Sequence, residues 1–167
     1  LNPSKIHCIV AIDEHDKVYT FAPDEIDQGV DLLSKADTLI GHNIIGYDIP
    51  AIKKLKDVDL TKSCNLIDTL LISRLLKPTR EGGHSLEMWG YRLKFHKSDQ
   101  PEWDVFTEDM LEYCIKDVQL NKKVYEVLLK YSEGFSAESI ELETSVAKIL
   151  HEQERVGFKF DMEKGVM

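Results

Sequence analysis

The chain has 167 residues, of which 43% are hydrophobic and 31% charged, and its 30 acidic against 21 basic side chains give a formal charge of −9. This composition excludes collagen-like, coiled-coil and disordered chains, and the length suffices for one hydrophobic core without disulfide or zinc staples. The acidic charge argues against a protein that coats duplex nucleic acid, because such binding needs clustered Lys and Arg in excess.

The first third of the chain predicts alternating strands and helices. Residues 6–12 form a short apolar run typical of a buried strand, and residues 17–21 alternate so that they can pair with it across the polar turn 13–16. Apolar positions at helical spacing predict a helix that contains residues 26–33, and residues 38–40 predict another strand. A helix is expected over residues 49–56, with Pro50 in its first turn and Asp48 as its N-cap.

The rest of the chain is predicted to be mostly helical. Residues 65–67 predict one more strand before a helix over residues 68–76, which Pro78 ends. Ser85 precedes a short helix, and residues 95–106 are expected to be irregular. Two long helices are expected over about residues 107–131 and 136–154. Strands early and helices late predict an α/β layer fold in which a mixed β-sheet is flanked by helices.

The cysteines and the apolar runs indicate an intracellular protein. Cys8, Cys64 and Cys114 are odd in number, widely spaced and set among apolar residues, which suits buried reduced thiols better than a disulfide framework or a structural zinc. No apolar run approaches the ~20 residues of a membrane span, and no signal segment opens the chain. We therefore expect a cytoplasmic monomer with no membrane partner.

Two short patterns could carry chemistry. Asn43, Tyr47 and Asp48 stand together at a junction between a strand and a helix. Tyr113 and Asp117 are four residues apart in a long helix, so they share one face of it. Hydrolysis of a phosphodiester with two metal ions needs several carboxylates that hold Mg²⁺ or Mn²⁺ and a group that orients the attacking water. The two patterns supply residues of these types.

Each of these residues also has a plain structural interpretation. Asp is among the best helix N-caps, so Asp48 can be only a cap. Tyr113 and Asp117 fit a half-buried aromatic and a solvated charge on a helix surface. Asn43 can satisfy backbone groups in the turn, and His42 can be a hydrogen-bonded core histidine. Singly these interpretations are the commoner ones, but the two patterns together favour the chemical one.

Together the two patterns resemble the second and third motifs of the DEDD family of 3′-to-5′ exonucleases, in its tyrosine-bearing branch. More narrowly, residues 67–76, 84–93 and 153–161 are similar to the proofreading domain of a family A DNA polymerase of the podophage kind. The resemblance implies a ribonuclease H-like sheet, two Mg²⁺ or Mn²⁺ ions and a single-stranded DNA 3′ end as substrate. It also implies that residues 1–135 form the exonuclease domain and residues 136–167 a connecting helix and the start of the polymerase domain, which would be its partner in the same parent chain. A phage-encoded protein of this kind would act in the cytoplasm of a bacterial host cell.

The resemblance assigns roles to individual residues. Asp117 would bind the metal ion that activates water, Asp48 would bind the second ion partly through water, and Tyr113 would orient the nucleophile. Three residues of the 42–48 segment are expected at the substrate: Asn43, Ile44 and Tyr47. Bases can stack on an aromatic such as Tyr47 or Trp103. Ile44 suits a core position at least as well, and basic residues such as Arg80 could either line a path for the strand or be ordinary solvated charges.

The first motif of the family, an Asp-any residue-Glu triplet, is missing from the first strand. The only such triplet is Asp161-Met162-Glu163, which more plausibly begins a helix. Without the motif only two of four metal carboxylates remain, and Mg²⁺ gives up its water reluctantly. We therefore expect the chain as printed to hold metal weakly and to be nearly inactive, and to lack the strand that carries the motif.

Two other functions stay open. A stand-alone DEDD exonuclease that acts on RNA would share the chemistry, although it would not need the polymerase-like tail from Gln153 onward. A vestigial exonuclease fold that serves as a structural module would account for the missing first motif. That second interpretation does not account for the presence of Asn43, Tyr47, Asp48 and the pair Tyr113 and Asp117 together.

Overall fold

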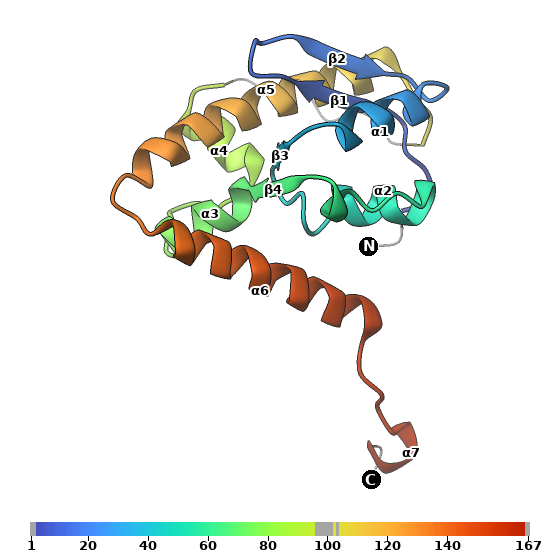
Figure 1. Ribbon diagram of the computed structural model, residues 1–167, viewed down its shortest axis with the longest axis vertical. Helices are drawn as coiled ribbons and strands as arrows, with labels where there is room; N and C mark the ends of the chain where they lie inside the picture. Colours follow the sequence, from blue (N-terminus) through green and yellow to red (C-terminus); the bar gives the residue numbers. More distant parts are fainter. Residues whose placement is uncertain (1–2, 96–101, 103, 166–167) are drawn as a thin grey trace.

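The computed structural model describes residues 3–95, 102 and 104–165, in which strands and helices alternate before long helices follow (Figure 1). The order of elements agrees with the prediction, with an additional 3₁₀ helix before the fourth strand. The elements are β1 (Ile9–Ile12), β2 (Val18–Phe21), α1 (Ile26–Ser34), β3 (Thr38–Gly41), α2 (Asp48–Lys56), η1 (Leu60–Lys62), β4 (Asn65–Asp68), α3 (Thr69–Leu76), α4 (Leu86–Arg92), α5 (Glu108–Tyr131), α6 (Ala137–Val156) and α7 (Met162–Gly165).

The strands of the described residues form two separate pairs. β1 and β2 are antiparallel, with Ile9 opposite Phe21, whereas β3 and β4 are parallel, with Gly41 opposite Asp68. Helices flank both pairs: α1 packs on β1 and β2, and α5 contacts β1, β2 and β3. The predicted α/β class, with small sheets of both senses flanked by helices, is confirmed and is consistent with a ribonuclease H-like fold.

The apolar core has two parts. One cluster joins Ile9 of β1, Leu39 of β3 and Leu66 of β4 with side chains of α1 and α2. The other lies among α3, α4 and α5 and is built from five buried residues: Ile72, Trp89, Leu120, Val124 and Leu128. β1 and β3 therefore share a core, although no hydrogen-bonded ladder joins them in the described residues.

Buried polar side chains connect α3 to its neighbours. The hydroxyl of Thr69, which is fully buried, donates to Oδ1 of Asn121 on α5 at 2.7 Å. One turn later, Oγ of Ser73 accepts from Nε1 of Trp89 on α4 at 3.2 Å and lies 2.8 Å from Nδ1 of His84. Because buried polar groups are costly without partners, these bonds favour one placement of α3 against α4 and α5.

Side-chain caps mark where several helices begin. Asp68, Ser85, Thr107 and Ser136 each accept a hydrogen bond from a backbone N–H in the first turn that follows. The helix expected after Asp161 also forms, since α7 begins at Met162. None of the helices in the described ranges is both long enough and apolar enough to span a membrane.

Helix α6 leaves the body of the molecule with an apolar face uncovered. Its predicted apolar positions are all exposed in the described part of the chain: Leu142, Val146, Ile149 and Leu150. α6 contacts α3 near its start but buries none of its own residues, and Figure 1 shows it running away from the strands toward α7. Nothing in the described part of the chain covers this stripe.

The core among α3, α4 and α5 predicts how two leucine substitutions differ. Leu120→Ala removes a fully buried side chain and leaves a cavity, so we expect the free energy of unfolding to fall by about 2–5 kcal/mol. The matched control is Leu142→Ala, whose side chain is 64% exposed and whose replacement should change stability by about 0.5 kcal/mol or less. Urea denaturation followed by circular dichroism measures both. Equal losses in the two variants would contradict the observed packing.

Candidate functional site

The segment from His42 to Asp48 links β3 to α2 through a tight turn. Asn43 has φ 62°, in the left-handed region that Asn tolerates better than most residues. Its carbonyl accepts the N–H groups of Gly46 at 3.1 Å and Tyr47 at 3.0 Å. A Cβ on Gly46 would lie 2.6 Å from Oδ1 of Asn43, so a larger residue there would displace the Asn43 side chain. The Asn43 side chain thus lies directly over the turn and does not merely extend into solvent.

The buried carboxylate of Asp68 holds this turn in place. Its Oδ1 accepts the N–H of Asn43 at 2.9 Å, and its Oδ2 accepts the N–H of Ile45 at 3.2 Å. The same Oδ1 accepts the N–H groups of Leu70 at 3.0 Å and Leu71 at 3.4 Å at the start of α3. One side chain at the end of β4 therefore fixes both the turn after β3 and the first turn of α3.

The start of α2 differs from the prediction. Asp48 is the first residue of the helix and not its N-cap; the N-cap is Tyr47, whose side chain makes no capping bond. The physical reason is that the preceding turn supplies an acceptor, because the N–H of Ile49 donates to the carbonyl of Ile44 at 3.1 Å. The expectation that Asp48 caps the helix was wrong, and its carboxylate is left for other interactions.

Asp48 has an altered pKa. Its surface is exposed, yet its carboxylate lies among many protein atoms, and this desolvation is the main reason that its pKa is raised to about 6; the nearby carboxylate of Asp68 adds to the rise. The backbone N–H of Asp48 itself acts in the opposite direction. Water on the exposed side screens the charge, so the direction of the shift is more informative than its size.

The second pattern lies on α5, where Tyr113, Cys114 and Asp117 are all half-buried. The pKa of the Cys114 thiol is raised, first by its hydrogen bond with Cys8, then by burial, and further by the negative charges of Cys8, Asp117 and Asp48. Both carboxylates therefore lie close enough to one thiol to act on it. Asp48 at the start of α2 and Asp117 on α5 thus act on the same thiol although they are far apart in the sequence.

These carboxylates do not form a complete metal centre. Carboxylate oxygens are the ligands that Mg²⁺ prefers. However, the residues described here contain no group of three or more His, Cys, Asp or Glu side chains placed to hold a metal ion. Asp48 and Asp117 are two of the four carboxylates that the family resemblance implies. Binding of Mg²⁺ or Mn²⁺ stays a prediction.

The residues expected at the substrate differ in exposure. Asn43 and Tyr47 are exposed, Tyr47 by 45%. Ile44 and Ile45 are 8% and 7% exposed and belong to the core cluster, which favours packing as the role of their side chains. Trp103 lies outside the described residues. Substrate contacts by Asn43, Ile44 and Tyr47 remain predictions.

Arg80 is more than a solvated charge. Its guanidinium lies 4.6 Å from the ring centre of Trp89, and that of Arg92 lies 5.3 Å from the same ring. Burial and the neighbouring Arg92 lower the pKa of Arg80. No ion pair of the described residues joins either arginine to a carboxylate. Two guanidinium groups thus flank one buried aromatic ring in an otherwise acidic chain.

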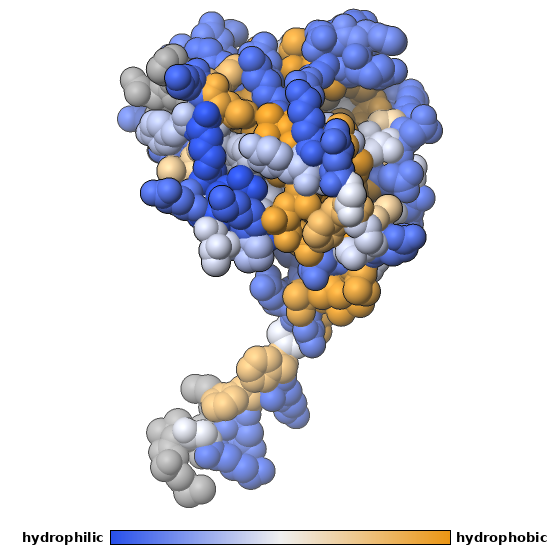
Figure 2. All heavy atoms as spheres, turned by 90° about the vertical axis from the view of Figure 1, so that its left-hand side faces the viewer, coloured by the Kyte–Doolittle hydropathy of each residue, from blue (hydrophilic) through white to orange (hydrophobic). Residues whose placement is uncertain are grey.

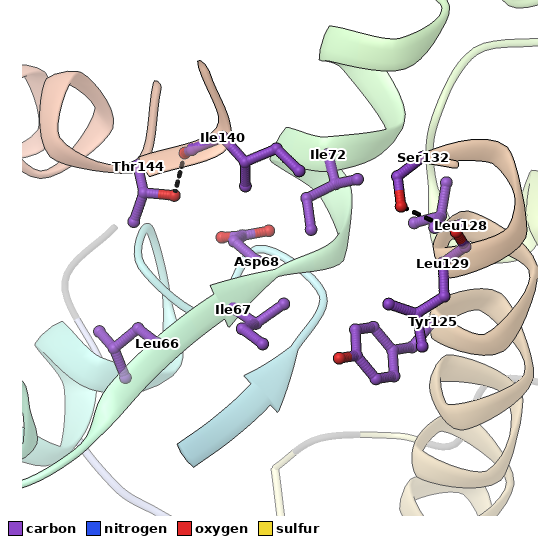
Figure 3. A pocket seen from close by; sticks show the side chains of 10 residues that line it. All are labelled: Leu66, Ile67, Asp68, Ile72, Tyr125, Leu128, Leu129, Ser132, Ile140 and Thr144. Atoms are coloured by element: carbon purple, nitrogen blue, oxygen red, sulfur yellow. Dashed lines mark hydrogen bonds between the residues drawn. The ribbon is translucent and has the colours of Figure 1, made fainter. Parts of the chain in front are cut away.

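A cavity of about 140 Å³ lies elsewhere, among β4, α3, α5 and α6 (Figure 3). Its wall is mainly apolar, and two of its hydroxyl groups bond to nearby backbone: Thr144 donates to the carbonyl of Ile140 at 2.7 Å, and Ser132 to that of Leu129 at 2.8 Å. None of Asp48, Tyr113 and Asp117 lines it. The cavity is therefore separate from the candidate site.

The role of Asp68 was not predicted from the sequence. The pattern marked it only as the start of a helix, although its position between a short strand and an apolar helix was a signal for an N-cap. Its second role, as acceptor for the turn 25 residues earlier, depends on the parallel pairing of β3 with β4. No local pattern could have indicated that contact.

The chain is similar in sequence to part of two phage DNA polymerases. It is 30% identical over 220 aligned positions to the DNA-directed DNA polymerase of Enterobacteria phage T3 and, to the same extent, to that of Escherichia phage T7. Each alignment takes in 95% of this chain and 31% of the relative, so the chain spans about a third of the length of these curated relatives. No family model matches the chain. The similarity relates the chain to a region of phage DNA polymerases.

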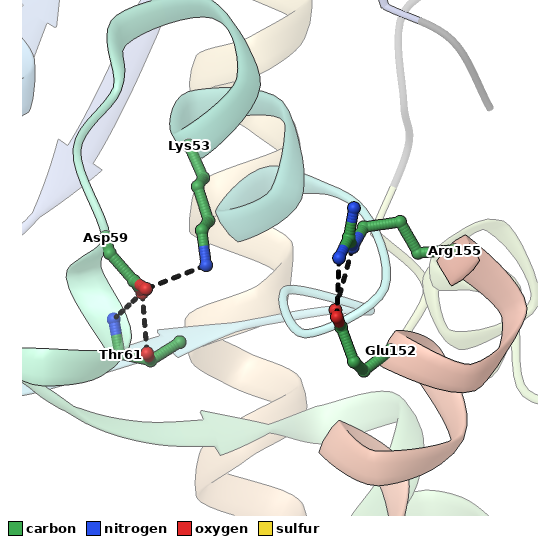
Figure 4. Close-up of polar contacts among 5 residues, drawn as sticks. All are labelled: Lys53, Asp59, Thr61, Glu152 and Arg155. Atoms are coloured by element: carbon green, nitrogen blue, oxygen red, sulfur yellow. Dashed lines mark hydrogen bonds and ion pairs between the residues drawn. The ribbon is translucent and has the colours of Figure 1, made fainter.

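Asp59 provides an internal reference for the Asp48 carboxylate. It lies 2.8 Å from Nζ of Lys53 and accepts hydrogen bonds from Thr61, and these contacts lower its pKa to about 2 (Figure 4). Figure 4 also shows the ion pair of Arg155 with Glu152 on α6, at 2.5 Å. Asp59 and Asp48 therefore illustrate opposite effects, one from cationic and hydroxyl partners and the other from desolvation.

The two carboxylates should titrate far apart. Carbon-detected NMR is expected to give a titration midpoint of about 6 for Asp48 and of about 2 for Asp59. Because the folded state holds the Asp48 proton more tightly than the unfolded chain, the free energy of unfolding falls as pH rises from about 4 toward about 6. Asp48→Asn should remove this fall, which amounts to about 1 kcal/mol after solvent screening. A midpoint for Asp48 at or below that of Asp59 would contradict the desolvation.

Proposed function

We propose that the chain is the 3′-to-5′ exonuclease, or proofreading, part of a phage-type DNA polymerase, and that it removes nucleotides from a single-stranded DNA 3′ end. The observation that carries the proposal is the convergence of Asp48 and Asp117, from α2 and α5, on the surroundings of one thiol. Both residues belong to patterns that resemble the second and third motifs of the DEDD exonucleases. The similarity to part of the T3 and T7 DNA polymerases supports the same assignment.

In this proposal each residue has its own task. The carboxylates of Asp48 and Asp117 would bind Mg²⁺ or Mn²⁺, which would supply charge stabilisation at the scissile phosphate. Tyr113 lies on α5 one turn before Asp117 and would hold the attacking water by a hydrogen bond from its hydroxyl. Asn43 and Tyr47 are exposed residues of the turn between β3 and α2, where they would contact the terminal nucleotide.

The gap in the strand order also supports the proposal. β1 and β3 contact the same helix and share one core cluster, but they are not paired with each other in the described residues. A strand inserted between their edges would join the two pairs into one mixed sheet. We propose that the missing Asp-any residue-Glu motif lies on such a strand in the natural protein, where it would add carboxylates beside Asp48 and Asp117.

The C-terminal part of the chain fits the proposed division into residues 1–135 and 136–167. The apolar stripe of α6 and the aromatic residues that follow it are exposed: Phe158 by 88% and Phe160 by 59%. Figure 2 shows apolar surface where the body meets the C-terminal tail. In the proposal, the remainder of a longer polymerase covers this surface.

Nuclease assays test the proposed residues. In the longest natural protein that contains this chain, Asp48→Asn and Asp117→Asn should each lower the rate of 3′ cleavage of labelled single-stranded DNA by at least about a hundredfold. Tyr113→Phe should lower it by about tenfold or more. The matched control is Asp31→Asn, which breaks only an exposed ion pair with Lys35 and should leave the rate unchanged.

The same assay separates the competing functions. Faster cleavage of an RNA 3′ end than of DNA would favour the stand-alone RNA exonuclease. No cleavage of either, in a protein that carries the complete first motif, would favour the vestigial structural module and contradict the proposal. Full activity in the Asp48 and Asp117 variants would refute the assigned site.

The 167-residue chain by itself should bind divalent cations weakly. With two carboxylates and no larger ligand group in the described residues, Mg²⁺ is expected to bind with a dissociation constant of roughly millimolar or weaker. Shifts of the backbone amide signals of Asp48 and Asp117 in an NMR titration measure it. Micromolar binding together with rapid cleavage of single-stranded DNA would contradict the expectation that this chain alone is nearly inactive.

A further inference from the structure

Two cysteines that are 106 residues apart in the sequence meet where β1 begins. Sγ of Cys8, the residue before β1, lies 3.6 Å from Sγ of Cys114 on α5. Both residues are half-buried. The remaining cysteine, Cys64, is buried elsewhere, and its thiol donates to the carbonyl of Leu33 at 3.3 Å.

The packing around the pair keeps the two sulfur atoms close. α5 packs along β1, and two turns beyond Cys114 the side chain of Lys122 reaches the turn between β1 and β2. Its Nζ lies 2.5 Å from Oδ1 of Asp16 and 3.3 Å from the carbonyl oxygen of Asp13. α5 therefore contacts the β1–β2 hairpin both at Lys122 and, through Cys114, beside the start of β1. The two thiols are close without a shift of α5 against β1.

We propose that Cys8 and Cys114 form a reversible intramolecular disulfide and that this pair is the site at which low-molecular-weight disulfides oxidise the chain. A disulfide needs sulfur atoms about 2.05 Å apart, so the two must approach by roughly 1.5 Å, a distance that side-chain rotation can provide. The inference concerns bond formation alone and does not depend on the proposed nuclease function. It places a redox-sensitive bond one residue from Tyr113 and three residues from Asp117.

The reaction balances with one molecule of oxidant. The thiolate of one cysteine attacks a sulfur of a disulfide such as oxidised glutathione and releases one molecule of reduced glutathione. The second protein thiolate then attacks the mixed disulfide and releases the other. Two protein thiols lose two protons and two electrons, and the oxidant is reduced to two thiols.

Oxidation of the whole chain with oxidised glutathione tests the proposal. The intact mass should fall by about 2 Da, the number of free thiols should drop from three to one, and dithiothreitol should reverse both changes. Because the bond closes a long loop, the melting temperature of the oxidised chain should rise by roughly 5–15 °C. Peptide mapping of the wild-type chain should find a Cys8–Cys114 cross-link.

Matched variants identify the partners. Cys64→Ser should still lose about 2 Da and gain thermal stability, whereas Cys114→Ser should do neither and should instead carry glutathione on Cys8. Peptide mapping needs no variant, so the test stands even if Cys114→Ser fails to fold. A cross-link that includes Cys64, a disulfide-linked dimer, or stable glutathione on both Cys8 and Cys114 of the wild-type chain would overturn the proposal.

Discussion

The carboxylate of Asp68 is the constraint on which the candidate site depends. It is only 5% exposed, and it accepts backbone N–H groups from two places, the turn after β3 and the first turn of α3. Loss of this acceptor would be costly, because several buried or part-buried backbone N–H groups would then lack a partner. The turn that Asp68 holds ends at Asp48. The position of the exposed Asp48 therefore depends on the buried carboxylate of Asp68. The negative charge of Asp68 also contributes to the raised pKa of Asp48.

The parts of the fold that follow local rules were predictable. The two long helices, the short strands and caps such as Ser85 depend on periodicity and on residues a few positions apart, and the structure contains them close to the expected bounds. Asp48 was misassigned as a cap because carbonyls of the preceding turn, which no propensity encodes, satisfy the start of α2. The separation of the strands into two pairs was likewise invisible, since strand pairing is decided by distant partners.

The candidate site was predictable only in part and only through resemblance. The four-residue spacing of Tyr113 and Asp117 predicts that they share a helix face. It does not predict that this face lies near Asp48. The contact between Cys8 and Cys114 joins residues 106 positions apart. The apolar neighbours of the cysteines predicted buried reduced thiols; all three are free, but only Cys64 is buried. Conversely, the core interpretation of Ile44 agrees with its burial. Long-range packing therefore determines what each short pattern can do.

The unpaired edges of β1 and β3 have a consequence for the behaviour of this chain in solution. Within the described residues, each of these strands has a pairing partner on one side only. An open edge presents a row of backbone donors and acceptors on which a strand of another molecule can add. The net charge of −9 keeps copies apart at low ionic strength, but salt at about 0.15 M screens charges beyond about 8 Å. Self-association through these edges should therefore increase with salt and protein concentration, because electrostatic repulsion opposes it and the strand geometry does not.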